Sequence, residues 1–166
     1  MSTKLKSSRN TYTIIVDNLR LRYRVKNGSV NAINGISFKI KPGEVLGIVG
    51  ESGCGKTSIA LSLIKLLPKN VSRFSGQISL QGKQVKKISE KLFRKQIRWK
   101  KISMVFQGAM NSLNPVIRVG DQIIEPLIIN KQDKHLAKEK AIELLKLVGL
   151  NEDIYSKYPH ELSGGM

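Results

Sequence analysis

The chain has 166 residues, of which 40% are hydrophobic and 25% are charged, and its formal net charge is +17. This hydrophobic content argues against a disordered chain and supports one domain with a core. The single cysteine allows no internal disulfide, which fits a reducing compartment, and no apolar run is long enough to cross a bilayer. The N-terminal segment is polar and basic, so we expect no secretory signal.

The positive charge is spread along the chain, with its densest clusters at residues 83–101 and 131–140. Such an excess indicates an acidic partner, which could be a nucleotide, a nucleic acid or an anionic membrane surface. A basic surface that is merely solvated explains the same charge at least equally well.

The N-terminal part predicts a tail followed by a hairpin. Residues 1–11 are expected to be flexible. Apolar and polar residues partly alternate over residues 12–23, and residues 30–40 have a similar composition, which indicates two strands. Because the turn dipeptide Asn27-Gly28 lies between them, we expect an antiparallel β hairpin.

Residues 50–57 follow the pattern Gly, four residues, Gly-Lys-Thr, which is typical of a phosphate-binding loop. The apolar run at residues 45–49 predicts a buried strand before the loop, and residues 58–67 predict a helix after it. The glycines allow backbone N–H groups to converge on an anion at the helix N-terminus. A glycine turn with an unrelated lysine is the alternative. The predicted nucleotide-binding residues here are Gly50, Glu51, Ser52, Gly53, Cys54, Gly55, Lys56, Thr57 and Ser58.

Two side chains of this loop have predicted chemical roles. Lys56 is expected to reach the outer phosphates as a point charge. The Thr57 hydroxyl is expected to bind Mg²⁺, which prefers oxygen ligands. Cys54 is expected to be a passive small residue, because the loop uses its backbone.

The middle of the chain predicts two short strands around a basic helix. Residues 76–82 form the first strand, closed by glycines, and residues 102–106 form a second, buried strand that ends at Gln107. Ser89 is the predicted N-cap of the helix, which runs toward Lys100. Three side chains of this helix are expected to face inward: Leu92, Phe93 and Ile97.

The C-terminal part predicts helices. Residues 108–130 contain Pro115 and Pro126, so helices there should be short or interrupted. Residues 137–148 predict a clear amphipathic helix with Gly149 as its C-terminal cap, and a polar loop follows at residues 151–161. The predicted buried face consists of Ala137, Ala141, Leu144, Leu145 and Val148.

Three further features accompany the phosphate loop. Gln107 begins the stretch Gln-Gly-Ala-Met-Asn-Ser-Leu-Asn-Pro, the chain ends in Tyr-Pro-His-Glu-Leu-Ser-Gly-Gly-Met, and Tyr23 lies on the hairpin. Together these features resemble the nucleotide-binding subunit of an ABC transporter, over nearly the whole chain from residue 12 to residue 166. The Ser-Leu-Asn-Pro segment and the final methionine resemble the dipeptide/oligopeptide/nickel import group of that family.

The resemblance implies an α/β P-loop NTPase fold. This fold has an antiparallel β hairpin region, a mostly parallel core sheet and a helical subdomain. The implied division is a nucleotide-binding core at residues 12–107, a helical subdomain at residues 108–161, and the start of the signature at residues 162–166.

The resemblance also assigns roles to residues outside the loop. Tyr23 would stack on adenine, although a strand residue that packs on its neighbours is the alternative. Gln107 would touch Mg²⁺ or the attacking water and sense the transmembrane partner. Ser163, Gly164 and Gly165 would close on ATP held by a second subunit. The two histidines, His135 and His160, offer no metal spacing and are expected to be surface residues.

The sequence departs from the family pattern after the signature. In the family, a strand with a magnesium-supporting Asp and a catalytic Glu follows, and then a switch histidine, and none of these positions is present. We therefore expect this chain to bind ATP weakly without hydrolysing it. The absence of that strand should expose an apolar edge and lower solubility. The economical interpretation is a fragment of a longer ATPase.

The function implied by the resemblance is that of an ATP-binding subunit that uses ATP and Mg²⁺ to drive solute import. The solute would be a dipeptide or oligopeptide, with nickel as a further possibility. The protein would lie peripherally on the cytoplasmic face of the membrane, with permease subunits, a second identical or paralogous ATPase subunit and, indirectly, an external solute-binding protein as partners. Nucleic acid is not an expected partner. A non-transport ABC ATPase that acts on nucleic acid and a truncated nucleotide-binding remnant are the alternatives.

Overall fold

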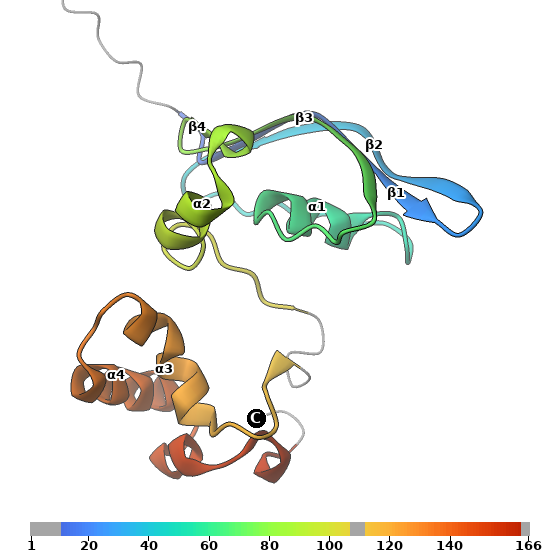
Figure 1. The fold of residues 1–166 in the computed structure, drawn as a ribbon. Coiled ribbons are helices and arrows are strands. Elements are labelled where there is room, and N and C mark those ends of the chain that lie inside the picture. The colour runs from blue at the N-terminus through green and yellow to red at the C-terminus, as the bar shows by residue number, and fades with distance from the viewer. Residues whose placement is uncertain (1–10, 107–111, 164–166) are drawn as a thin grey trace, which may run out of the picture. The chain divides into compact units, whose positions relative to one another are not determined.

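The structure is a computed structural model that describes residues 11–106 and 112–163. The chain divides into two compact units at the boundary between Met104 and Val105 (Figure 1). We call them the sheet unit, which is described over residues 11–104, and the helical unit, which is described over residues 105–106 and 112–163. The predicted boundary between the nucleotide-binding core and the helical subdomain, after Gln107, lies close to this division.

The sheet unit is built on a four-stranded antiparallel sheet in the order β2-β1-β3-β4. The strands are β1 (Ile14–Val25), β2 (Gly28–Ile40), β3 (Val71–Leu80) and β4 (Lys83–Gln84). The predicted hairpin is confirmed, because β1 pairs with β2 in antiparallel register up to the pair Val25 and Gly28. The predicted strand at residues 76–82 corresponds to β3, which begins five residues earlier.

The partial alternation in β1 results from a bulge at Asn18. Its φ of 45° lies in the left-handed region, and the pairing register with both neighbouring strands shifts at this point. The bulge adds a residue to the strand, so Val16 and Leu19 both face the core although they are three positions apart. Leu21 continues the buried face.

Two helices cover one face of this sheet (Figure 1). α1 (Lys56–Leu63) contributes Ile59 to the main apolar cluster, and α2 (Glu90–Gln96) contributes Phe93. The 3-10 helix η1 (Val85–Lys87) joins β4 to the segment before α2. The core of the sheet unit therefore lies between the sheet and the helix that follows the glycine-rich loop.

α2 begins as predicted and ends earlier than predicted. The Ser89 Oγ accepts a hydrogen bond from the Leu92 N–H at 3.4 Å, so the predicted N-cap is confirmed. The helix stops at Gln96 because the N–H groups of residues 100–102 all turn back to the Ile97 carbonyl. Phe93 and Ile97 are buried as predicted, whereas Leu92 is 42% exposed and that part of the prediction is wrong.

The two strands predicted beside the glycine-rich loop do not form among the described residues. Residues 45–49 make no strand pairing, and Val45 and Val49 are 95% and 94% exposed. In residues 102–106, Ile102 makes one isolated parallel bridge with Arg98, and Val105 is 88% exposed. A parallel strand needs hydrogen-bonded neighbours from distant parts of a chain, and no described segment provides them. The sheet of the described residues is antiparallel and corresponds to the predicted antiparallel β hairpin region of the P-loop fold.

The helical unit packs α3 (Val119–Ile129) beside α4 (Lys134–Leu147) (Figure 1). The short 3-10 helices η3 (Glu152–Ser156) and η4 (Pro159–Glu161) follow. Helices in this region were predicted to be short or interrupted; α3 is 11 residues long and continues through Pro126 for three more residues. No helix in residues 11–106 or 112–163 has both the length and the hydropathy needed to cross a membrane.

The predicted amphipathic helix corresponds to α4. Three of its predicted inward residues are buried: Ala137, Ala141 and Leu145. Two others are not, because Leu144 is 40% exposed and Val148 is 68% exposed. Gly149 follows the helix with a φ of +78°, the left-handed conformation of the predicted glycine cap.

Candidate functional site

The glycine-rich loop leads directly into the N-terminus of α1. Gly55 is the N-cap residue, and its φ of 98° is left-handed. A Cβ atom at Gly55 would overlap the backbone oxygen of Ala32 in β2, so only glycine fits between the loop and this strand. The antiparallel sheet thus fixes the start of α1, where backbone N–H groups lack helical acceptors.

The Lys56 side chain lies within the curve of the loop. Its Nζ donates to the carbonyl oxygens of Gly50 at 2.6 Å and of Glu51 at 2.7 Å. The same ammonium lies 3.5 Å from the Cys54 Sγ. The loop therefore surrounds a fixed positive charge at the positive end of a helix dipole, an arrangement that attracts phosphate groups.

The first turn of α1 also carries two hydroxyl groups. The Thr57 side chain belongs to an exposed residue, and Ser58 is half-buried. An exposed threonine hydroxyl beside a phosphate-attracting loop is a suitable ligand for Mg²⁺, which keeps several waters and takes few protein ligands. Within the described parts of the chain, no group of three or more His, Cys, Asp or Glu side chains could hold a metal. The residues present thus fit a magnesium ion that phosphate oxygens and Thr57 would hold together.

Tyr23 lies in β1 beside this helix. Its hydroxyl donates to the Ser58 Oγ at 3.1 Å, and its ring packs against the core of the sheet unit. The structure therefore shows Tyr23 packing on its neighbours, which was the alternative to adenine stacking. Stacking of Tyr23 on adenine stays a prediction.

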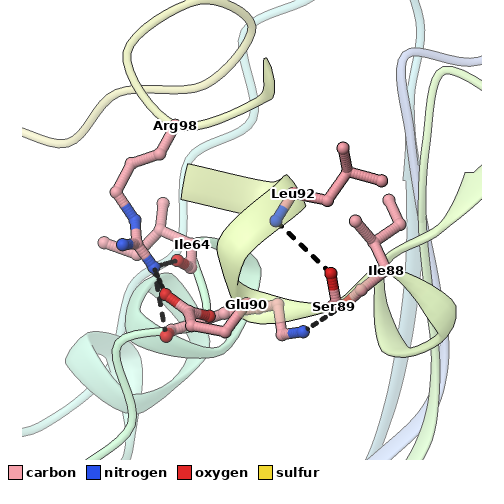
Figure 2. A network of polar contacts seen from close by, with 7 residues as sticks. Ile64, Ile88, Ser89, Glu90, Leu92 and Arg98 are labelled. Atoms are coloured by element: carbon pink, nitrogen blue, oxygen red, sulfur yellow. Dashed lines mark hydrogen bonds and ion pairs between the residues drawn. The ribbon is translucent and has the colours of Figure 1, made fainter. Parts of the chain in front are cut away.

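The far end of α1 is held by Arg98, a residue that the sequence did not single out (Figure 2). The Arg98 guanidinium donates to the carbonyl oxygens of Ile64 at 3.0 Å and Lys65 at 3.4 Å, and it pairs with Glu90 at 3.0 Å. Lys65 in turn donates to the Ile88 carbonyl at 2.7 Å. A cation at the C-terminal end of a helix satisfies its free carbonyls and complements its dipole. The contacts with backbone carbonyls join residues more than 20 positions apart, so no local pattern could reveal them.

In the helical unit, the segment before Ser163 is tightly held. The Tyr158 N–H donates to the Glu161 carboxylate at 2.6 Å, and the Tyr158 ring stacks on His160 with 5.7 Å between centroids. Leu162 packs against the cluster around Val119. Ser163 is exposed directly after this anchored segment.

Three predicted site residues lie outside the described residues: Gln107, Gly164 and Gly165. The segment after Gln107 is described from Ser112 onward, and Gln122 in α3 organises it. The Gln122 side chain accepts from the Asn114 N–H at 2.8 Å and donates to the carbonyls of Asn114 and Ile117. A glutamine in a polar helix position carries no sequence signal for such a role.

Comparison with known sequences identifies a family. A sequence model described as ABC transporter matches residues 33–166. The chain is 41% identical over 162 residues to the oligopeptide transport ATP-binding protein OppD of Bacillus subtilis (strain 168), covering 95% of this chain and 45% of that protein. It is 40% identical to OppD of Escherichia coli (strain K12), covering 91% of this chain and 45% of the relative. The chain thus spans about half the length of the curated relatives it matches.

Solved structures agree with the sequence comparison. The dimeric structure of MJ0796, a bacterial ABC transporter cassette, matches with a TM-score of 0.78 and 26% identity, covering 92% of this chain and 64% of that one. A post-hydrolysis state of the same cassette with ADP and Pi matches with a TM-score of 0.76 and 22% identity, with the same coverage, which supports the fold alone.

Proposed function

This chain belongs to the ABC transporter family, and we propose that it is the nucleotide-binding part of an ATP-binding subunit that powers import of dipeptides or oligopeptides. The proposed solute class rests on the relatives, which are named as oligopeptide and dipeptide transport ATP-binding proteins. Nickel remains the second candidate solute. The observation that carries ATP binding is the Lys56 ammonium inside the loop at the start of α1.

The residues of the loop divide the work of holding ATP. Lys56 would exchange its two loop carbonyls for phosphate oxygens, and the N–H groups at the start of α1 would bind the same anion. The Thr57 hydroxyl would contribute one ligand to Mg²⁺, which supplies charge neutralisation when bound. Tyr23 would lie beside the base, and the Arg98 contacts would keep α1 oriented.

We expect the 166-residue chain to bind ATP without appreciable turnover. Phosphoryl transfer to water needs groups that orient the water and stabilise the developing charge. Lys56 supplies positive charge within the loop. Gln107 is proposed to touch Mg²⁺ or water, and Ser163, Gly164 and Gly165 are proposed to close on ATP bound by a second subunit.

The proposed assembly follows from the same family membership. Two ATP-binding subunits, identical or paralogous, would bind ATP between them. Their closure on ATP would be transmitted to the permease subunits. An external solute-binding protein would deliver the solute. The protein would then lie on the cytoplasmic face of the membrane as a peripheral subunit.

Titration of the 166-residue chain with a fluorescent ATP analogue in Mg²⁺ tests the proposal. Lys56→Ala should weaken binding roughly 10- to 100-fold, because a charge-assisted hydrogen bond contributes about 1.5–3 kcal/mol. Lys26→Ala is the matched control, since Lys26 is an exposed lysine in the turn region of the hairpin. Equal affinities for the wild type and Lys56→Ala would refute the assignment of the loop.

A further inference from the structure

A basic surface covers the region of α2. Residues 83–101 carry nine lysines and arginines and one carboxylate, Glu90. Eight of the nine cations belong to exposed residues, and Arg98 is the half-buried exception. We call these eight exposed cations, together with Trp99, the α2 basic surface; its cations are Lys83, Lys86, Lys87, Lys91, Arg94, Lys95, Lys100 and Lys101.

Three of these cations share one face of α2. Lys91, Arg94 and Lys95 stand three and four positions apart, which places them side by side on a helix. Phe93 and Ile97, which are buried in the core, occupy the opposite face. The helix is therefore anchored by its apolar side and presents a concentrated positive charge on the other side.

The charge of this surface is not neutralised within the described parts of the chain. Glu90 pairs with the half-buried Arg98, and none of the eight exposed cations forms a salt bridge with a described carboxylate. Lys86 donates to the Phe74 carbonyl at 3.4 Å, and Lys101 donates to the Gln81 side chain at 3.0 Å, but these acceptors are uncharged. The surface thus keeps its full charge available to an anionic partner.

Trp99 stands exposed in the turn that ends this helix. The residue is 66% exposed, and its φ of 68° lies in the left-handed region. Its N–H donates to the Ile102 carbonyl at 2.9 Å, so the turn is hydrogen-bonded rather than open. Trp99 lies four positions after Lys95, which limits the distance between their Cα atoms to about 14 Å. A large amphipathic ring is therefore presented outward, close to the cationic face.

We propose that the α2 basic surface docks on a membrane surface rich in anionic lipids, with the Trp99 ring at the level of the headgroups. Polybasic segments bind anionic leaflets, and tryptophan is the side chain enriched at membrane interfaces. The exposed apolar side chain of Leu92 adds to this contact. The choice of a membrane over other anionic partners rests on the proposed function. The positive charge and the exposed Trp99 ring are observed independently of that function.

Nucleic acid is the less favoured partner. Binding of a single strand uses several aromatic rings on which successive bases stack. In residues 83–101 the second aromatic ring, Phe93, is fully buried in the core, so one ring alone is exposed. A single interfacial tryptophan is sufficient for a headgroup contact but forms no stacking platform.

Because Trp99 is the one tryptophan of the sequence, its emission reports on this surface alone. The 166-residue chain is titrated with phosphatidylglycerol/phosphatidylcholine vesicles and with vesicles of phosphatidylcholine only. We expect a blue shift and protection from iodide quenching with the anionic vesicles alone, and a loss of both as salt is raised. An equal shift with neutral vesicles, or no shift with either, overturns the proposal.

Charge reversal tests which cations bind. The triple variant Lys91→Glu/Arg94→Glu/Lys95→Glu should lower vesicle partitioning by roughly 100-fold or more, at about fivefold for each of the three lost cations. The control Lys26→Glu/Lys69→Glu/Lys134→Glu changes the net charge equally at exposed lysines elsewhere and should retain most of the binding. Equal losses in both triples would show unspecific attraction and refute the α2 basic surface.

Two further measurements separate this proposal from its rivals. In sedimentation with vesicles, Trp99→Ala should lower partitioning roughly tenfold or more through the lost apolar contact. If the Trp99 emission changes more with a single-stranded oligonucleotide than with anionic vesicles, the α2 basic surface binds nucleic acid in preference to membranes. That result would overturn the proposal. Lys56→Ala should leave vesicle binding unchanged, so a failure of ATP binding and a failure of membrane docking are observed separately.

Discussion

The two units of the chain differ in how far their charges are paired internally. The helical unit pairs three of its lysines with carboxylates, through Lys140 with Glu143, Lys146 with Glu152, and Lys157 with Asp153. The hydrogen bond from Lys157 also lowers the pKa of the Asp153 carboxyl. The sheet unit has a larger core, yet it leaves the α2 basic surface without carboxylate partners and exposes the apolar residues 45–49.

This difference shows which surfaces of the molecule have unsatisfied charges that a partner could bind. A unit whose charges are paired internally gains little from an anionic partner. The sheet unit carries the glycine-rich loop, the unpaired cations and the exposed apolar residues together. The surfaces of the sheet unit are thus the ones from which a nucleotide, a membrane or a further strand would gain binding energy.

The largest effect on stability is expected from Gly55→Ala. The added methyl group would overlap the Ala32 carbonyl, and the φ of 98° disfavours a side chain, so the free energy of unfolding should fall by about 3 kcal/mol or more. Gly53→Ala, with a φ of +80° and open space, should cost about 1 kcal/mol. Gly47→Ala, in open space without a positive φ, should be nearly neutral. Chemical denaturation checks this order, and equal losses at Gly53 and Gly55 would show that the contact with β2 is unimportant.

A second variant tests whether the units are independent. In Gly120→Ala, the methyl group would overlap the Tyr155 ring, and we expect a loss of about 1–3 kcal/mol from overpacking. Hydrogen exchange should show lower protection in α3 and α4 and unchanged protection in β1. Adding Tyr155→Leu should restore part of the stability. Equal loss of protection in the sheet unit would contradict the comparison of two separate units.

The smallest effects are expected at the two helix N-caps, one in each unit. Asp133 accepts from the N–H groups of His135 at 2.9 Å and Leu136 at 3.2 Å, so Asp133→Ala should cost about 1 kcal/mol. Ser89 accepts one longer bond of 3.4 Å, so Ser89→Ala should cost about 0.5 kcal/mol. Thermal unfolding of both variants measures the difference, with Asp133→Asn as the control that retains a cap. A larger loss of stability in Ser89→Ala than in Asp133→Ala would contradict the ranking of the two N-caps by their hydrogen-bond lengths.

The sequence predicted those features that depend on nearby residues. The hairpin about Asn27-Gly28, the Ser89 cap and the Gly149 cap each involve groups within a few positions, and the structure has all three. The family followed from short motifs for the same reason. The position of Lys56 at the start of α1 was likewise readable, because the loop pattern is continuous in the chain.

The failures concern distant partners. Residues 45–49 have the composition of a buried strand, but composition cannot supply the neighbouring strands that pairing requires. The Arg98 contacts with α1 join residues more than 30 positions apart, and the Tyr23 contact with Ser58 depends on how β1 meets a helix. Leu92 was misplaced because α2 is only seven residues long, so a helical period defines its buried face poorly.

The Gln122 side chain has a mechanical consequence. One amide group both accepts and donates, and it thereby satisfies three backbone groups of residues 114–117. This segment cannot bend without breaking those bonds. A displacement of the segment would therefore move α3 with it. A glutamate at position 122 would keep the acceptor and lose both donations. The rigidity of residues 114–117 therefore depends on one amide group that both donates and accepts hydrogen bonds.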